Sequence, residues 1–204
     1  MKPIIRAVEQ IRTIPGAKVD CGLRQGRGEF LAFVHKQTIE VWKIPVMQDD
    51  WYIEENQRIL AEVERGIEPH HLPADYAFFL EYYCGLVIDR DDYRFSMYGI
   101  GLMSEEWYSY LVGDEFLFEG GFLKIAYTLT RDEKENFLVF FLDLAGNIHS
   151  GCVIAIAEKD IGKIGITQIL KDPNSFTVYW YKLADSFTNW IMQAAITKGK
   201  FDFA

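Results

Sequence analysis

The amino-acid sequence predicts an α+β fold: an antiparallel meander sheet backed by helices, in a single domain with an N-terminal helix-hairpin extension. Apolar residues recur at helical spacing in the first half of the chain and alternate with polar residues beyond Gly120-Gly121. They return to helical spacing near the C-terminus. Helices followed by a run of strands and a closing helix are typical of the α+β class.

The N-terminal part of the chain predicts two helices with a hairpin between them. Residues 3–14 are expected to form an amphipathic helix. Residues 29–35 and 38–44 alternate in the manner of two hairpin arms. A second helix is expected over residues 50–65, with Gly66 in the C′ position that favours glycine. The inward residues of the first helix are predicted to be Ile4, Ile5, Val8 and Ile11.

An aromatic helix is predicted next along the chain. It begins at Leu72-Pro73, because proline lacks the N–H that a first helical residue leaves unpaired. Gly85 is expected to stop it, and a short strand then leads to Gly99-Ile100-Gly101. Ser104 is expected to cap a further short helix. The apolar stripe of the aromatic helix consists of Tyr76, Phe79, Leu80 and Tyr83, widened by Phe78 and Tyr82.

Three strands and a last helix are predicted in the C-terminal part. Residues 123–130 alternate as in a half-buried strand, and residues 137–142 are continuously apolar, as in a central strand covered on both faces. A turn at residues 145–147 leads to a returning strand over residues 148–157. Ser186 is expected to cap the closing helix. Its inward residues are predicted to be Phe187, Trp190, Ile191, Ala194 and Ala195.

Charge is unevenly distributed along the chain, whose net charge is −9. Residues 1–48 carry eight Lys/Arg against four Asp/Glu, a balance of +4. Residues 49–123 carry four against seventeen, a balance of −13, and residues 124–204 carry nine of each. An acidic middle region repels nucleic acid and favours encounter with a basic partner. A solvated helical surface is the alternative explanation of the same charges.

Length and cysteine content predict one soluble cytoplasmic domain. A chain of 204 residues is long enough to bury a sizeable core. Its first residues lack the apolar run of a secretory signal, and no stretch approaches the ~20 apolar residues of a membrane span. Cys21, Cys84 and Cys152 are widely spaced and include no CxxC pair, which fits a reducing compartment. We therefore expect no contact with a membrane.

The residues that could carry chemistry are better explained by structural roles. His70-His71 are adjacent in a loop, where two histidines rarely converge on one ion. The glycine-rich segment from Gly22 to Gly28 precedes a predicted strand, whereas a phosphate loop precedes a helix. Cys84 is expected at a helix C-terminus, where the helix dipole raises a thiol pKa, and Cys152 is expected to be buried in a strand. We expect no catalytic residue, no metal and no cofactor.

Several motifs carry a resemblance to a known family. The segment LPADYAFFL at residues 72–80 is followed by a glycine stop and by the GIG of residues 99–101. A helix carrying Trp107 comes next, and residues 184–187 read Ala-Asp-Ser-Phe at the start of the closing helix. This pattern resembles the SUKH superfamily, which includes bacterial immunity proteins and fungal killer-toxin-resistance and cell-wall regulators. The likeness covers about residues 50–196, so we divide the chain into an N-terminal extension, 1–48, and a SUKH-like domain, 49–204.

The resemblance implies a helix-backed sheet that binds proteins, most often a toxin domain and frequently a nuclease. A nuclease must be basic to hold phosphate, which fits the acidic middle region. The residues expected to contact the partner are acidic, with two aromatic anchors. They are Asp89, Asp91, Asp92, Glu105, Glu106, Trp107, Tyr108, Asp114, Glu115 and Glu119.

Three hypotheses follow for the function. The first is a cytosolic bacterial immunity protein that neutralises a basic toxin domain stoichiometrically, without catalysis. The alternative is an intracellular regulatory or scaffolding module that binds an endogenous partner. The third is an enzyme with an unrecognised site. The sequence leaves open the identity of the partner, the oligomeric state and the role of residues 1–48.

Overall fold

The computed structural model describes residues 2–21, 60–61, 63–97, 117–118, 121–130, 138–161 and 180–201. Within them the strands form one sheet in the order β1-β2-β3-β5-β6-β7-β8, with β4 paired to β5, and each pairing is antiparallel. The strands are β1 Ala17–Cys21, β2 Tyr83–Asp89, β3 Tyr93–Met97, β4 Leu117–Phe118, β5 Phe122–Thr130, β6 Leu138–Asp143, β7 Val153–Ala157 and β8 Trp180–Ala184. The helices are α1 Lys2–Arg12, α3 Ala74–Tyr82, α5 Glu158–Ile161 and α7 Phe187–Thr197. The predicted α+β class with an antiparallel sheet and an N-terminal helix is confirmed.

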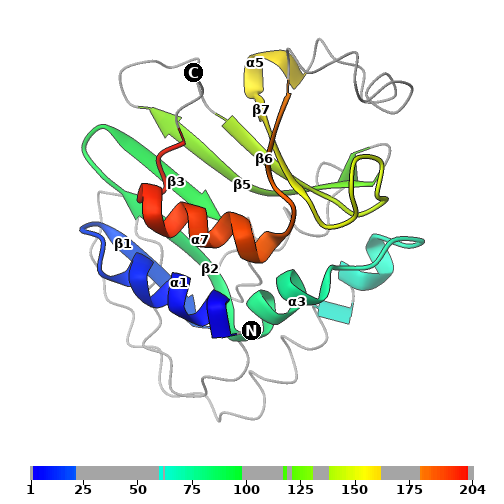
Figure 1. Cartoon of the computed structure of the whole chain (residues 1–204), viewed down its shortest axis with the longest axis horizontal. Helices are drawn as coiled ribbons and strands as arrows, with labels where there is room; N and C mark the ends of the chain where they lie inside the picture. Colours follow the sequence, from blue (N-terminus) through cyan, green and yellow to red (C-terminus); the bar gives the residue numbers. More distant parts are fainter. Residues whose placement is uncertain are drawn as a thin grey trace.

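One face of the sheet carries a layer of three helices. Figure 1 shows α7 and α1 side by side, with α3 close to the right-hand end of α7 in that view. Each helix turns its apolar side inward, as Ile4, Val8 and Ile11 of α1 do. Ile5 of the same helix is 36% exposed, so its predicted inward position is wrong. Residues 2–21, assigned to an extension, supply both a helix of this layer and strand β1 at the edge of the sheet.

Strand β6 is buried on both of its faces, as its continuous apolar sequence predicted. Phe140 and Leu142 point to the helical layer and belong to the main core. Val139 and Phe141 alternate with them and belong to a second apolar cluster with residues of β7 and β8. A strand that must be apolar at every position is typical of the interior of a sheet.

The centre of the main core is a set of packed aromatic rings around Trp190 of α7. Its ring centroid lies 5.8 Å from that of Phe95 on β3 and 5.3 Å from that of Phe140 on β6. It also lies 5.8 Å from Phe187 and 6.1 Å from Phe201. Trp190 is fully buried and therefore joins the helical layer to two strands of the sheet.

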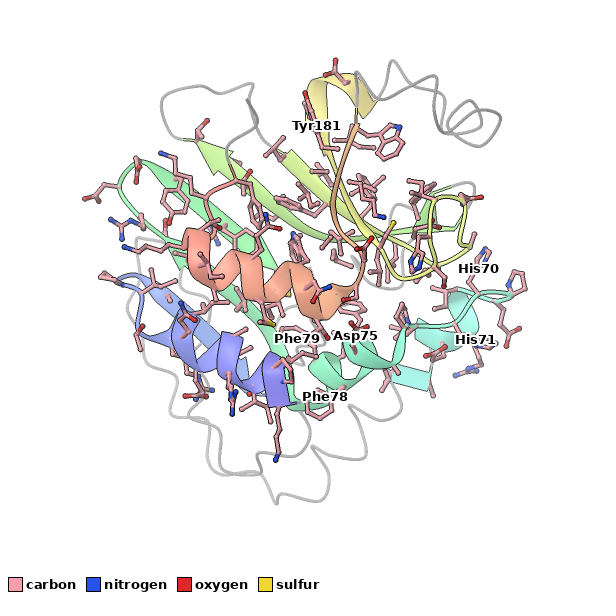
Figure 2. The ribbon with its side chains drawn as sticks, viewed as in Figure 1. His70, His71, Asp75, Phe78, Phe79 and Tyr181 are labelled. Carbon is pink, nitrogen blue, oxygen red and sulfur yellow. The ribbon has the colours of Figure 1, made fainter. Side chains whose placement is uncertain are left out.

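Helix α7 is held at both of its ends. The Ser186 hydroxyl accepts a hydrogen bond from the Asn189 N–H at 3.2 Å, which confirms the predicted cap. The Asp75 carboxylate of α3 accepts from the Thr188 N–H at 2.8 Å and from its hydroxyl at 3.0 Å. Figure 2 shows Asp75 between α3 and α7. At the C-terminal end Lys198 adopts the left-handed conformation, with φ of 58°.

Several predicted boundaries differ from the structure. The aromatic helix ends at Tyr82, and the chain passes directly into β2, so Gly85 lies within a strand and does not stop the helix. Cys84 is consequently in a strand and not at a helix C-terminus. The returning strand begins at Val153 and not at Ile148. Gly66 is helical and has no positive φ, so it is not a left-handed C′ residue.

Other predicted elements lie outside the described residues. They are the hairpin of residues 29–44, most of the helix of residues 50–65, and the segment from Gly99 to the helix at Ser104. Among the described residues, none of the helices combines the length and the apolar content that a membrane crossing requires.

Replacing Trp190 tests the packing of the helical layer on the sheet. Trp190→Ala is expected to lower the free energy of unfolding by about 3–5 kcal/mol, because it opens a cavity among aromatic rings that cannot all close in. Met192→Ala on the same helix is the control, since Met192 is 41% exposed and its truncation should cost less than about 1 kcal/mol. Urea unfolding followed by circular dichroism measures both. Similar losses for the two variants would contradict this account of the core.

Candidate protein-binding surface

The hairpin between β2 and β3 carries the described part of the predicted binding surface. Asp89 ends β2 and is half-buried, whereas Asp91 and Asp92 are exposed in the turn that follows. The Arg90 N–H donates to the Tyr93 carbonyl at 2.9 Å and closes this turn. The other predicted contact residues lie outside the described residues. They are Glu105, Glu106, Trp107, Tyr108, Asp114, Glu115 and Glu119.

The segment after α1 anchors this hairpin from one side. The Asp89 N–H donates to the Gly16 carbonyl at 3.0 Å. Gly16 has a φ of +82°, and a Cβ at this position would lie 2.0 Å from the Asp89 carbonyl oxygen. Only glycine fits this contact without strain.

The segment after α7 anchors the hairpin from the other side. The Tyr93 hydroxyl donates to the Lys198 carbonyl. Burial raises the pKa of the Tyr93 phenol, an effect that the charge of Arg90 opposes, so the hydroxyl remains a donor at neutral pH. A Cβ on Gly199 would lie 2.9 Å from Ile88 Cδ1, which shows how closely this segment packs on β2. The C-terminal ends of two helices therefore fix the acidic turn in place.

The same packing brings basic residues to the acidic turn. Lys200 Nζ lies 3.9 Å from Asp92 Oδ2, and both side chains are exposed. Lys198 is also exposed, and the Arg90 guanidinium lies 6.0 Å from the centroid of the Tyr93 ring. The hairpin surface therefore has mixed charge, with two cations supplied by a segment more than a hundred residues away in sequence. An exposed pair such as Lys200–Asp92 contributes at most about 1 kcal/mol, so a partner's cation can compete for Asp92.

The two adjacent histidines do not act together. His71 Nδ1 lies 3.7 Å from Glu64 Oε2 at the surface. His70 packs instead on Gly121, and a Cβ added to Gly121 would lie 2.8 Å from His70 Nε2. Figure 2 shows both in the loop before α3. The described residues contain no group of three or more His, Cys, Asp or Glu side chains arranged to hold a metal ion.

Asp143 is a polar residue whose role the sequence interpretation missed. Its buried carboxylate accepts from four backbone N–H groups, on Gly146, Asn147, Ile148 and His149, at 2.8–3.2 Å. These hydrogen bonds hold residues 146–149 in a loop around Asp143, so that β7 begins only at Val153. The sequence pattern that could have predicted this role is an aspartate followed by Gly146-Asn147, because Asp side chains accept hydrogen bonds from nearby backbone N–H groups in turns. Its oxygens are engaged in holding the loop, which is a structural role.

Cys152 lies next to this loop and is fully buried. Burial, helped by the negative charge of Asp143, raises the pKa of its thiol to about 11. At neutral pH the thiol is therefore protonated and a poor nucleophile, in agreement with the structural role predicted for it.

Comparisons with protein-family models, with curated proteins and with solved structures found no match. The resemblance to the SUKH superfamily stays a prediction from the motifs of residues 72–101 and 184–187.

Gly16→Ala tests the anchoring of the hairpin by the segment after α1. We expect it to lower the free energy of unfolding by at least about 2 kcal/mol, because alanine is strained at this φ and its Cβ meets the Asp89 carbonyl. Gly66→Ala is the matched control. A Cβ at this helical position meets nothing within 4 Å, so the change should be neutral or stabilising. Equal effects in urea unfolding would argue against the close contact.

The buried thiol can be tested by alkylation. With iodoacetamide at pH 8, Cys152 of the folded protein is expected to remain unlabelled, because its raised pKa leaves little thiolate and its sulfur is inaccessible. Labelling in urea should be complete within the same period. Peptide mass spectrometry reads out this cysteine separately from Cys21 and Cys84. Rapid labelling of the folded protein would show that Cys152 is accessible and reactive.

Proposed function

We propose that this protein is a cytoplasmic immunity protein that binds and neutralises a basic bacterial toxin domain stoichiometrically, without chemistry of its own. The observation that carries the proposal is the acidic excess of residues 49–123, whose described part exposes Asp91 and Asp92 on a fixed hairpin. The motifs that resemble the SUKH superfamily support the same function.

The anchoring of the hairpin matters for binding. A loop that is ordered before it meets a partner loses little conformational entropy on association. The turn of residues 90–92 is held through Gly16 and through Lys198, so its acidic side chains are presented on a preformed surface. Preorganisation of this kind favours a binding surface over a flexible solvated loop.

Long-range charge supports a basic partner, and a nuclease domain in particular. Residues 49–123 have a balance of −13, and a surface of one sign raises the rate of encounter with the opposite sign. A nuclease domain carries the basic surface that holds phosphate, and an acidic protein can cover that surface. The proposed interface also includes Trp107 and Tyr108 as aromatic anchors, which are predicted from the sequence alone.

The alternative is an intracellular scaffolding module bound to an endogenous partner. The observation that favours it is the exposed basic side of α1, with Lys2 and Arg6, which the acidic-surface proposal leaves unused. Deletion of residues 1–48 cannot separate the two functions, because α1 buries four residues in the core and β1 pairs with β2. Substitution of Lys2 and Arg6 by Gln leaves the core intact. Loss of the endogenous partner with this variant would favour the scaffold.

The charge of the hairpin is tested by reversing it. Protein carrying Asp91→Lys and Asp92→Lys is used to capture partners from the native organism's lysate at ~50 and ~500 mM salt, a range over which exposed charges become strongly screened. We expect wild-type protein to retain a basic protein at low salt and the variant to retain at least about tenfold less, because steering by charge is lost. Quantitative mass spectrometry measures the retained protein.

The matched control for this experiment is Glu68→Lys with Glu158→Lys. Both glutamates are exposed and outside the hairpin, and the variant has the same net charge as the hairpin variant. It is expected to retain most of the partner. Equal losses in the two variants would show that net charge alone matters and would rule out the hairpin as the binding surface.

A further inference from the structure

The outward side of α7 is unusual for an exposed helix because the helix contains no charged residue. Five residues point into the core, and the outward side consists of Asn189, Met192, Gln193 and Ile196. Ile196 is 70% exposed and Met192 is 41% exposed. Residues four apart lie next to each other on a helix, so these two side chains form one small apolar patch.

Exposed cations lie on the elements next to this patch, helix α1 and the residues that follow α7. Helix α1, which packs beside α7, exposes Lys2, Arg6 and Arg12 and a single acid, Glu9, which pairs with Arg12 at 3.2 Å. Lys198 and Lys200 follow α7 and are also exposed. The two helices and the residues that follow α7 thus carry five exposed cations and one exposed acid, in a chain of net charge −9.

The patch and the cations of α1 lie at similar heights along two parallel helices. The segments after α1 and after α7 both contact the β2–β3 hairpin, so the helices run in the same direction, as Figure 1 also shows. Both rise by about 1.5 Å per residue. Arg12 and Ile196 therefore lie at similar heights near the hairpin, and Arg6 and Met192 lie at similar heights one to two turns earlier.

We propose that the outward face of α1 and α7 docks an acidic amphipathic helix of a partner protein. Its apolar side would cover Met192 and Ile196, and its acidic side chains would lie against Arg6 and Arg12. Amphipathic helices that bind protein surfaces present apolar anchors at i and i+4. Met192 and Ile196 of α7 have the same spacing, so two successive anchors of the partner helix can contact them. This surface adjoins the acidic hairpin through Lys198 and Lys200. The proposal does not depend on the proposed function.

The chemistry of the face favours a short acidic segment over a larger polyanion. A chain of net charge −9 is repelled at long range by duplex nucleic acid and by an anionic membrane, both of which carry dense negative charge. A phosphate backbone also offers no apolar surface for Ile196. A single acidic helix carries few charges and supplies both kinds of contact.

The test uses a fluorescent peptide as the probe. The peptide is a helix of about 18 residues of Leu, Ala and Glu, with Leu along one side and Glu on its flanks. Its binding to the full chain is followed by fluorescence anisotropy. We expect the double variant Met192→Gln, Ile196→Gln to bind at least about tenfold more weakly, because the apolar contact is lost. Arg6→Glu should weaken binding and also reduce its dependence on salt.

Leu129→Gln is the matched control. It also replaces a partly exposed apolar side chain by Gln, but Leu129, which is 39% exposed, lies on strand β5 and outside the proposed surface. It should bind the peptide as the wild type does. A scrambled peptide of the same composition should bind at least about tenfold more weakly. The proposal is overturned if wild-type protein does not bind the peptide, if the double variant or scrambled peptide binds equally well, or if duplex DNA or anionic vesicles bind more tightly.

Discussion

The packing of Trp190 against rings from both layers is the interaction on which the rest of the structure depends. It contacts Phe95 of β3 and Phe140 of β6 while its helix also contacts α1. Because α7 is fixed on the sheet in this way, the residues that follow it reach the β2–β3 hairpin. The Asp75–Thr188 hydrogen bonds then tie α3 to the opposite end of α7. Helix α7 is thus held on the sheet by the buried Trp190 ring and by hydrogen bonds near both of its ends.

The hairpin shows how packing decides what a charged segment can do. Counted along the sequence, its neighbourhood is strongly acidic, yet folding places Lys198 and Lys200 beside Asp92. For the basic partner that we propose, the long-range excess of acid would speed encounter. In close contact, the cations of that partner would compete with these lysines for Asp92. On α1 the exposed charges are mostly basic, and the second docking surface that we propose depends on this difference from the acidic turn.

The sequence predicted the parts of the fold that depend on local patterns. The Ser186 cap, the alternating strand β5 and the doubly buried strand β6 all follow from spacing or from a local hydrogen bond. The sequence analysis expected one short strand between Gly85 and Gly99, where the structure has two, β2 and β3. Strand β2 pairs with β3 and also with β1, more than sixty residues earlier, and this long-range pairing overrides the turn preference of Gly85. Asp92 was predicted at the site, but its pairing with Lys200 depends on tertiary structure that no local pattern encodes.

Hydrogen–deuterium exchange of the protein alone and in complex with the proposed basic partner tests the central claim most directly. Asp91 and Asp92 lie in an exposed turn outside the strand ladders, so their amides should exchange rapidly in the free protein. The account predicts strong protection of residues 89–93 in the complex. Unchanged exchange in this turn, with protection confined to other segments, would contradict it.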